Sequence, residues 1–333
     1  MRTLVGLGAS ALMALATVAA FAHRTPPPLA PTSLGVEHLH FNALTMNGER
    51  LLAAGAMGEI LYTDNQGGEW KRANVKQDRQ ALLVSMAFSK DKKVGMAVGH
   101  EGWILRTQDG GKTWEEVAFD KENGEPLMSI AQLPSGEWVA VGAFGRALHS
   151  LDGGNSWQAW PLPEEVQDKH LNRIAHSDDG QYWLIAGELG LLVESKDFGQ
   201  TWHTVPPFYN GSFYNAMALP NGGWLTYGMR GNVYRKADAH SAWQQSTVGA
   251  PVSFFSHTLQ ADGNITLVGQ GATIGVSNNN GQSFSLQKVP GRATLTDVVQ
   301  SPNGKTWIAS TSGIQTLPTA APGEAAARQG ASK

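Results

Sequence analysis

The sequence predicts an all-β chain that folds as a single seven-bladed β-propeller of four-stranded antiparallel blades. Three observations predict this fold: a unit that recurs six times, a repeat length of 41 to 45 residues, and turn signals that divide each unit into four short strands. A repeat of about 40–45 residues with four strands is the length of one propeller blade.

Each unit begins with a glycine turn and ends fifteen positions later on an aromatic residue, as in GHEGWILRTQDGGKTW. The leading glycines and closing aromatic residues are Gly55 and Trp70, Gly99 and Trp114, Gly142 and Trp157, Gly187 and Trp202, Gly228 and Trp243, and Gly269 and Phe284. Length varies only outside this conserved part, where loops are expected. Asn-Gly, Asp-Gly and Pro-x-Gly hairpin signals precede the glycine turns and separate the first two strands of each unit.

The seventh unit is incomplete. After Phe284 the chain supplies three strands, near residues 295–300, 306–310 and 313–317, and then a tail of Ala, Gly and charged residues. A propeller must be locked where its two ends meet, and an unpaired edge strand promotes aggregation. We therefore expect residues 31–39 to close the last blade as an N-terminal fourth strand. The propeller would then cover residues 31–318, followed by a disordered tail at 319–333.

The N-terminal segment has the pattern of an export signal. An apolar run follows Arg2 and ends in Ala20-Phe21-Ala22, which has the small-x-small form of a signal-peptidase site, so residues 1–22 are expected to be removed. An uncleaved inner-membrane anchor is the alternative, because the run approaches the roughly 20 residues that span a bilayer. Residues 23–30 form a Pro-rich linker.

The amino-acid composition restricts the expected cellular compartment and the expected classes of binding partner. The sequence has no cysteine, hence no disulfide framework and no lipid-modified cysteine, which suits a periplasmic protein. Its formal charge of −3 over 333 residues excludes the basic field that nucleic-acid binding needs.

The turn between the third and fourth strands of each unit carries an Asp-box motif, also called the bacterial neuraminidase repeat. The complete copies are Thr107-x-Asp109-x-Gly111-x-Thr113-Trp114 and the equivalents at Asp152 with Trp157 and Asp197 with Trp202, while the degenerate copies are Asn65 with Trp70, Asp238 with Trp243, and Asn279 with Phe284. The carboxylate is expected to accept N–H bonds within its own turn, glycine to supply positive φ, and the aromatic ring to wedge between blades. The alternative to this structural role is calcium binding, but each copy of the motif offers at most two carboxylates.

Seven Asp-box blades behind a signal peptide resemble the photosystem II assembly and stability factor family and its non-photosynthetic bacterial relatives, over about residues 41–317. The resemblance implies a non-enzymatic propeller, one face of which holds a membrane-protein partner during assembly, with an arginine-rich patch contributing. The arginines of this chain are scattered. We expect an exported, monomeric scaffold that assists assembly or stability of a membrane or envelope complex. The alternative is a sialidase-like glycan-binding or glycoside hydrolase propeller.

Partner binding is expected on the face that carries the Gly-x-x-Gly turns and the connections between blades, around the mouth of the channel. The candidate residues from these turns are His100, Glu101, Phe144, Arg146, Glu188, Met229 and Arg230. Tyr209 and Tyr214, in the loop 206–215, are added because aromatic side chains dominate interface energetics. The equal alternative is that Phe213 and Tyr214 simply begin the inner strand and pack between blades.

The innermost strands are expected to begin at Ala43, Ser85, Ser129, Arg173, Ala216, Ser256 and Asp297. Arg173 and Asp297 depart from the small residues of the other units. A salt bridge or a solvated channel lining explains them simply, and ligand binding is the functional alternative. Glu101, Glu188 and Asp297 are the acids that a glycosidase would need at this mouth. His38 and His40 give a weak metal signal with no third ligand, so we expect neither a metal nor a cofactor.

Overall fold

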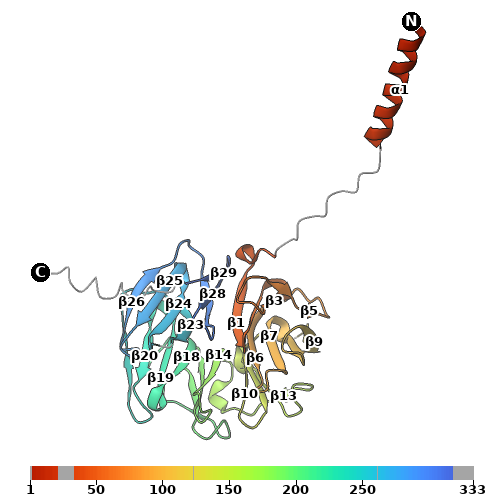
Figure 1. Ribbon diagram of the computed structural model, residues 1–333. Helices are drawn as coiled ribbons and strands as arrows, with labels where there is room; N and C mark the ends of the chain where they lie inside the picture. The colour runs from red at the N-terminus through yellow and green to blue at the C-terminus, as the bar shows by residue number, and fades with distance from the viewer. Residues whose placement is uncertain (1, 22–33, 123, 261, 318–333) are drawn as a thin grey trace, which may run out of the picture. The chain divides into compact units, whose positions relative to one another are not determined.

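The computed structural model describes residues 2–21, 34–122, 124–260 and 262–317, in two compact units, Met1–Ser33 and Leu34–Lys333 (Figure 1). The first unit contains the helix α1 (Arg2–Phe21), where the sequence predicts a signal peptide. No helix in the described part of the chain has the length and apolar character needed to cross a membrane. The predicted linker at 23–30 and tail at 319–333 lie outside the described residues.

The second unit is a β-propeller of seven antiparallel blades, as predicted (Figure 1). The strands of blades one to three are β1 (Phe41–Asn47), β2 (Arg50–Gly55), β3 (Ile60–Thr63) and β4 (Lys71–Arg72); β6 (Leu83–Phe88), β7 (Gly95–Gly99), β8 (Ile104–Thr107) and β9 (Thr113–Ala118); and β10 (Leu127–Gln132), β11 (Trp138–Gly142), β12 (Ala147–Ser150) and β13 (Gln158–Ala159).

The strands of blades four to seven are β14 (Leu171–His176), β15 (Trp183–Gly187), β16 (Leu192–Ser195) and β17 (His203–Thr204); β18 (Phe213–Leu219), β19 (Gly223–Gly228), β20 (Val233–Lys236) and β21 (Trp243–Gln245); β23 (Phe254–Leu259), β24 (Ile265–Gly269), β25 (Thr273–Ser277) and β26 (Ser283–Lys288); and β27 (Leu295–Gln300), β28 (Thr306–Ser310) and β29 (Gly313–Thr316). Two short strands, β5 (Asn74–Val75) and β22 (Thr247–Val248), add a parallel edge to blades two and six.

Eight short 3-10 helices lie in the described connections: η1 (Val36–His38), η2 (Ala56–Gly58), η3 (His100–Gly102), η4 (Ala143–Gly145), η5 (Glu164–Val166), η6 (Pro220–Gly222), η7 (Met229–Gly231) and η8 (Gln270–Ala272). Five of them, η2, η3, η4, η7 and η8, form the turn between the second and third strands of a blade. Residues 188–190 form the corresponding turn of blade four.

The blades are held together by seven apolar clusters, one at each interface between neighbouring blades. The second strands contribute to every cluster and are buried along their length, as in β7, β11 and β15. The first strands contact one another in a ring that runs from β1 through β27 and returns to β1. The ring is therefore closed.

The predicted closure by an N-terminal strand is wrong for the described residues. Blade seven has three strands, β27, β28 and β29, and residues 36–38 form η1 rather than a fourth strand. The helix η1 contacts β29 at close range: a side chain at Gly313, where φ is +120°, would stand 2.5 Å from the carbonyl oxygen of Val36. Residues 31–33 of the predicted strand lie outside the described residues.

An apolar seam closes the ring instead. Val36 is buried in the same cluster as Phe41 and Leu51 of blade one and Trp307 and Ile314 of blade seven. The indole rings of Trp70 and Trp307 meet edge to face across the seam, with centroids 6.2 Å apart. The N-terminal segment thus contributes a side chain to the core, and the count of seven blades does not depend on a shared strand.

Candidate functional site

The two faces of the propeller carry different turns, because successive strands are antiparallel. One face, which we call the turn face, carries the Gly-x-x-Gly turns and the connections between blades. The other, the hairpin face, carries the hairpins between first and second strands and the Asp boxes between third and fourth strands.

The Asp boxes of the hairpin face are folding devices. In blade two the carboxylate of Asp109 accepts hydrogen bonds from the N–H groups of Lys112 and Thr113, at 2.9 and 3.0 Å, and from the Thr113 hydroxyl at 2.7 Å. Asp152 and Asp197 make equivalent bonds. The closing aromatic residue of each copy packs in the cluster shared with the preceding blade. Each box therefore fixes its own turn and places the ring that joins two blades.

These hydrogen bonds stabilise the ionised carboxylates. Partial burial raises the pKa of Asp109, but the bonds from Thr113, Thr107 and Lys112 together lower it further, to about 2. The hydroxyl and N–H of Thr201 hold the pKa of Asp197 at about 2. Asn65 and Asn279 accept the corresponding N–H bond through an amide oxygen, at 2.9 and 3.0 Å, without a charge.

The free energy of unfolding should consequently fall in acid. A depressed folded-state pKa contributes stability above the unfolded value of about 3.9 and loses it as the pH drops through the folded value near 2. Urea unfolding at pH 7, 4 and 3 measures this loss. A triple variant, Asp109→Asn, Asp152→Asn and Asp197→Asn, should lose less between pH 4 and pH 3 than the parent protein. An identical loss in both proteins would contradict the assignment.

In each of the first five blades, the turn face presents one side chain at the tip of the Gly-x-x-Gly turn. At the equivalent position of blades one to five lie Met57, Glu101, Phe144, Leu189 and Arg230, with φ between 51° and 58°. Blade six has Gly271 there. The side chains of Met57, Phe144 and Leu189 are 58, 57 and 57% exposed. Large non-glycine residues rarely adopt positive φ, and such backbone strain concentrates at functional sites.

Two other candidates of the turn face, Arg146 and Glu188, already have partners within the chain. Arg146 follows η4 and approaches Asp120 and Glu125 at 3.7 and 4.0 Å, so its charge is partly neutralised. Glu188 accepts a hydrogen bond from the N–H of His170 at 2.9 Å, which holds the connection into blade four.

Two further candidates lie next to the tips: His100 is exposed in η3, and Met229 is half-buried in η7. Arg230, the tip residue of η7, is exposed.

The aromatic loop before blade five is mainly packing. Tyr209 lies 5.1 and 5.2 Å from Phe213 and Tyr234, in the cluster between blades four and five. Phe208 stacks on Trp243 and is 36% exposed. Tyr214 stacks on Phe255 of blade six, with ring centroids 5.4 Å apart. The alternative that these residues pack between blades is therefore supported, because Phe213 is buried in the cluster between blades four and five and Tyr214 contacts blade six.

The strand registers define one residue per blade around the channel, which we call the axial ring. In every first strand an irregularity separates the first and third residues, and the third residue belongs to the ring. The ring consists of Ala43, Ser85, Ser129, Arg173, Asn215, Ser256 and Asp297. The sequence alignment placed Ala216 here and was wrong by one residue in blade five, because the first hairpin varies in length between blades and its turn signals do not fix the register.

Asp297 ties three blades together. It is 9% exposed, and its carboxylate accepts bonds from the N–H of Leu44 in blade one at 2.6 Å, the Ser256 hydroxyl in blade six at 2.5 Å, and its own neighbour Val298 at 2.9 Å. Burial raises the pKa of this carboxyl, opposed by the Arg173 charge and these bonds. Asp297 is thus engaged in the closure of the ring, and we no longer count it among the partner-binding residues.

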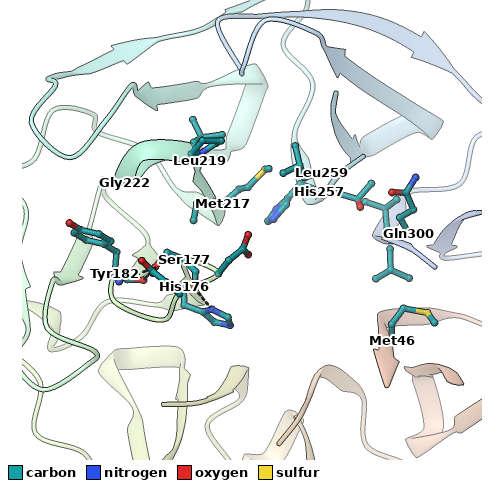
Figure 2. A pocket seen from close by; sticks show the side chains of 17 residues that line it. Met46, His176, Ser177, Tyr182, Met217, Leu219, Gly222, His257, Leu259 and Gln300 are labelled. Carbon is teal, nitrogen blue, oxygen red and sulfur yellow. Dashed lines mark hydrogen bonds between the residues drawn. The ribbon is translucent and has the colours of Figure 1, made fainter. Parts of the chain in front are cut away.

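Arg173 and Asp297 do not form the salt bridge that the sequence suggested. The side chain of Arg173 has no hydrogen bond or ion pair with any residue that the structure describes. It lines the axial cavity, a space of about 950 Å³ that opens on the hairpin face. A second space of about 650 Å³ shares Met46, Met217 and His257 with it and forms the outer part of the same mouth. Figure 2 shows Met217 and His257 directed into this space, between Leu219, Leu259 and Gln300.

The candidate metal and enzyme groups are not assembled. The imidazole of His40 bonds to the side chain of Asn42 at 3.1 Å. Among the described residues no group of three or more His, Asp or Glu side chains is placed to hold a metal ion. Glu101 and Glu188 do not line the axial cavity. The side chains that sequence reasoning missed are Tyr227 and His257, and comparing equivalent positions across the blades would have singled them out.

The solved structures that resemble the chain show its fold. A structure described as YCF48 bound to D1 peptide superimposes with a TM-score of 0.68 and 17% identity, over 89% of this chain and 99% of the other. A streptogramin B lyase structure superimposes with a TM-score of 0.66 and 14% identity, over 86% of this chain and 96% of the other. At these identities the likeness concerns the propeller alone.

The sequence of this chain matches curated relatives and a family model. The photosystem II assembly lipoprotein Ycf48 of Synechococcus sp. strain CC9902 is 23% identical over 64% of this chain and 63% of its own length. The chloroplastic photosystem II stability/assembly factor HCF136 of Arabidopsis thaliana is 22% identical over 75% and 68%. The match thus spans roughly two thirds of these relatives. The model of the family described as photosynthesis system II assembly factor YCF48 matches residues 70–325, and the chain belongs to that family.

Proposed function

We propose that this chain is an exported, non-enzymatic scaffold whose turn face captures a segment of a membrane or envelope protein while the complex of that protein is assembled. The observation that carries the proposal is the ring of turn tips. Met57, Phe144 and Leu189 hold large apolar side chains more than half exposed on strained backbone. Glycine or asparagine would suit these positions better if they served the fold alone.

The chemistry of the face suits a protein segment. Apolar and aromatic side chains supply the anchors of protein interfaces, and charged groups around them give specificity. Glu101 and Arg230 occupy equivalent tips in blades two and five, beside the apolar tips. The relatives support the same reading, since they are named as assembly factors and one is described with a bound D1 peptide. The identity of the partner in this organism is a separate question from the surface that binds it.

The three acids expected at this mouth are not brought together as a pair in the part of the chain that the structure describes, which supports binding over hydrolysis. A glycosidase needs two carboxyl groups flanking the substrate. Of the three acids expected at this mouth, Asp297 is occupied by three donors and Glu188 by the His170 N–H. Glu101 stands exposed at its turn tip. We therefore place protein capture above glycan binding, and propose a monomer.

Capture should depend on the three apolar tips. The variant Met57→Asn, Phe144→Asn and Leu189→Asn should keep or slightly raise the free energy of unfolding, because asparagine tolerates positive φ, while recovery of partners falls strongly. The matched control carries Leu151→Asn, Phe198→Asn and Leu259→Asn, which are 70, 44 and 45% exposed on the hairpin face.

Pull-downs from solubilised membranes, quantified by mass spectrometry, compare the three proteins. Loss of the same partners in the control variant alone, or unchanged recovery with both variants, would contradict the proposal. Recovery of glycans rather than proteins by the parent protein would favour the carbohydrate alternative.

Export places this face outside the cytoplasm. We propose cleavage after Ala22 and a periplasmic protein beginning at His23, on the small-x-small site that follows the apolar run. Mass spectrometry of the N-terminal peptide from the purified protein checks this. An intact Met1 recovered with the membrane fraction would instead support the anchored form.

A further inference from the structure

The repeats provide an internal comparison that isolates three unusual residues around the channel. Positions that pair with the axial ring across the first two strands hold Ala54, Val98, Val141, Ala186, Tyr227, Val268 and Ala309. Positions directly after the axial ring hold Leu44, Met86, Ile130, Ile174, Ala216, His257 and Val298. Tyr227 and His257 thus replace apolar residues in blades five and six, and Arg173 is the one long cation of the axial ring, in blade four. Three adjacent blades depart from the pattern together.

Tyr227 and His257 are joined by a hydrogen bond, with Tyr227 buried and His257 half-buried at the wall of the cavity. Tyr227 is 0% exposed, and its hydroxyl lies 2.5 Å from Nδ1 of His257. Burial raises the pKa of Tyr227 well above its usual value, so the phenol keeps its proton and donates to Nδ1. Burial first, and the Arg173 charge second, lower the pKa of His257 to about 3. The imidazole is therefore neutral at physiological pH, with its hydrogen on Nε2.

Arg173 supplies a positive charge in the same cavity. Asp297, the acid of the axial ring, is already bonded to Leu44, Ser256 and Val298. At the mouth, Asp179 accepts hydrogen bonds from the Ser177 hydroxyl and the Gln181 N–H, and Lys90, Lys92 and Asp178 also line the cavity. No described acid is paired with Arg173. A guanidinium without a partner in a cavity is suited to bind a carboxylate.

We propose that the axial cavity is a binding site for a carboxylate carried on a short apolar chain. The guanidinium of Arg173 binds the carboxylate, Nε2–H of His257 donates to it or to a neighbouring oxygen, and the thioethers of Met46, Met86 and Met217 contact the apolar part. The cavity of about 950 Å³ has room for such a group. The carboxylate belongs either to a small organic acid or to the C-terminus of a polypeptide. This site opens on the hairpin face and does not depend on what the turn face binds.

Methionine methyl resonances report on the site without a label in the ligand. The protein, purified as the cell exports it and labelled with ¹³C at methionine methyl groups, is titrated with hexanoate and, as a neutral isostere, with hexanamide. Hexanoate should shift the Met217 and Met46 resonances in a saturable manner, whereas Met57 and Met229 on the turn face should not move. Hexanamide should bind at least about tenfold more weakly, because it lacks the charge that Arg173 recognises.

The variant Arg173→Gln should weaken hexanoate binding about tenfold or more, and its matched control Arg230→Gln, on the turn face, should leave binding unchanged. A tripeptide Ala-Leu-Leu with a free C-terminus, compared with its C-terminal amide, distinguishes the two sources of the carboxylate. Binding of the free peptide but not of hexanoate assigns the site to a chain terminus, and the reverse assigns it to a small acid. Equal binding of hexanoate and hexanamide, or no saturable shift with either acid, overturns the proposal whether or not the variants fold.

Discussion

Replacing Trp307 with alanine should lower the free energy of unfolding by about 3–5 kcal/mol, the usual cost of removing a buried tryptophan. Trp307 is 6% exposed in the seam between blades one and seven. Its indole N–H has no hydrogen-bond partner among the described residues, so the loss is one of packing and of the contact with the Lys305 ammonium, 4.1 Å from the ring centroid. The seam is also where the two ends of the ring meet, and no strand crosses it in the described residues. Opening it should therefore expose apolar surface and promote aggregation.

Urea unfolding at pH 7 measures the effect, with Trp243→Ala as a comparison. Trp243 is half-buried between blades four and five and should cost less. The double variant Trp70→Ala and Trp307→Ala should be less destabilised than the sum of the single variants, since the two rings are in contact. A loss below about 1 kcal/mol for Trp307→Ala would show that the seam does not hold the ring closed.

Replacing Asp297 with alanine should lower the free energy of unfolding by about 3 kcal/mol. The change removes the acceptor of two buried N–H groups and of the Ser256 hydroxyl, and a buried donor left without a partner costs about 1–3 kcal/mol. Asp297→Asn should cost less, because its amide oxygen can still accept from Val298 and Ser256, although its NH2 group then faces the Leu44 N–H. The same unfolding measurements test this order, and an equal loss in both variants would contradict the role of the second carboxylate oxygen.

The repeated part of the fold could be predicted because each blade carries its own local signals. The fixed spacing of glycine, Asp box and aromatic residue determines turns that form within a few residues, as the hydrogen bonds of Asp109 show. The ends of the ring carry no such repeat. Residues 36–38 could extend along β29 or turn across it, and the burial of Val36 in the seam decides this. That choice depends on contacts with blades one and seven, which the sequence pattern does not contain.

The sequence placed the candidate site on the turn face, and the structure shows which of the expected side chains reach that face. The third residue of each Gly-x-x-Gly turn reaches the turn face, as with Phe144 and Arg230. Met57 and Leu189 occupy equivalent tips and were passed over, because apolar residues gave no chemical signal by themselves. Asp297 was assigned to the face because it departs from its neighbours, yet its partners lie in two other blades. A charged residue in a repeat therefore indicates that a position is special, while its neighbours in space decide whether it serves binding or closure.

Site-specific cross-linking tests the central claim, that the turn face binds the partner. The chain has no cysteine, so a single introduced cysteine can carry a photo-activated cross-linker at one known position. Leu189→Cys places it at a turn tip, 57% exposed, and Leu151→Cys places it on the hairpin face, 70% exposed. After illumination in cells, the account predicts an adduct with a membrane or envelope protein from position 189 and none from position 151. An adduct from position 151 alone would contradict it.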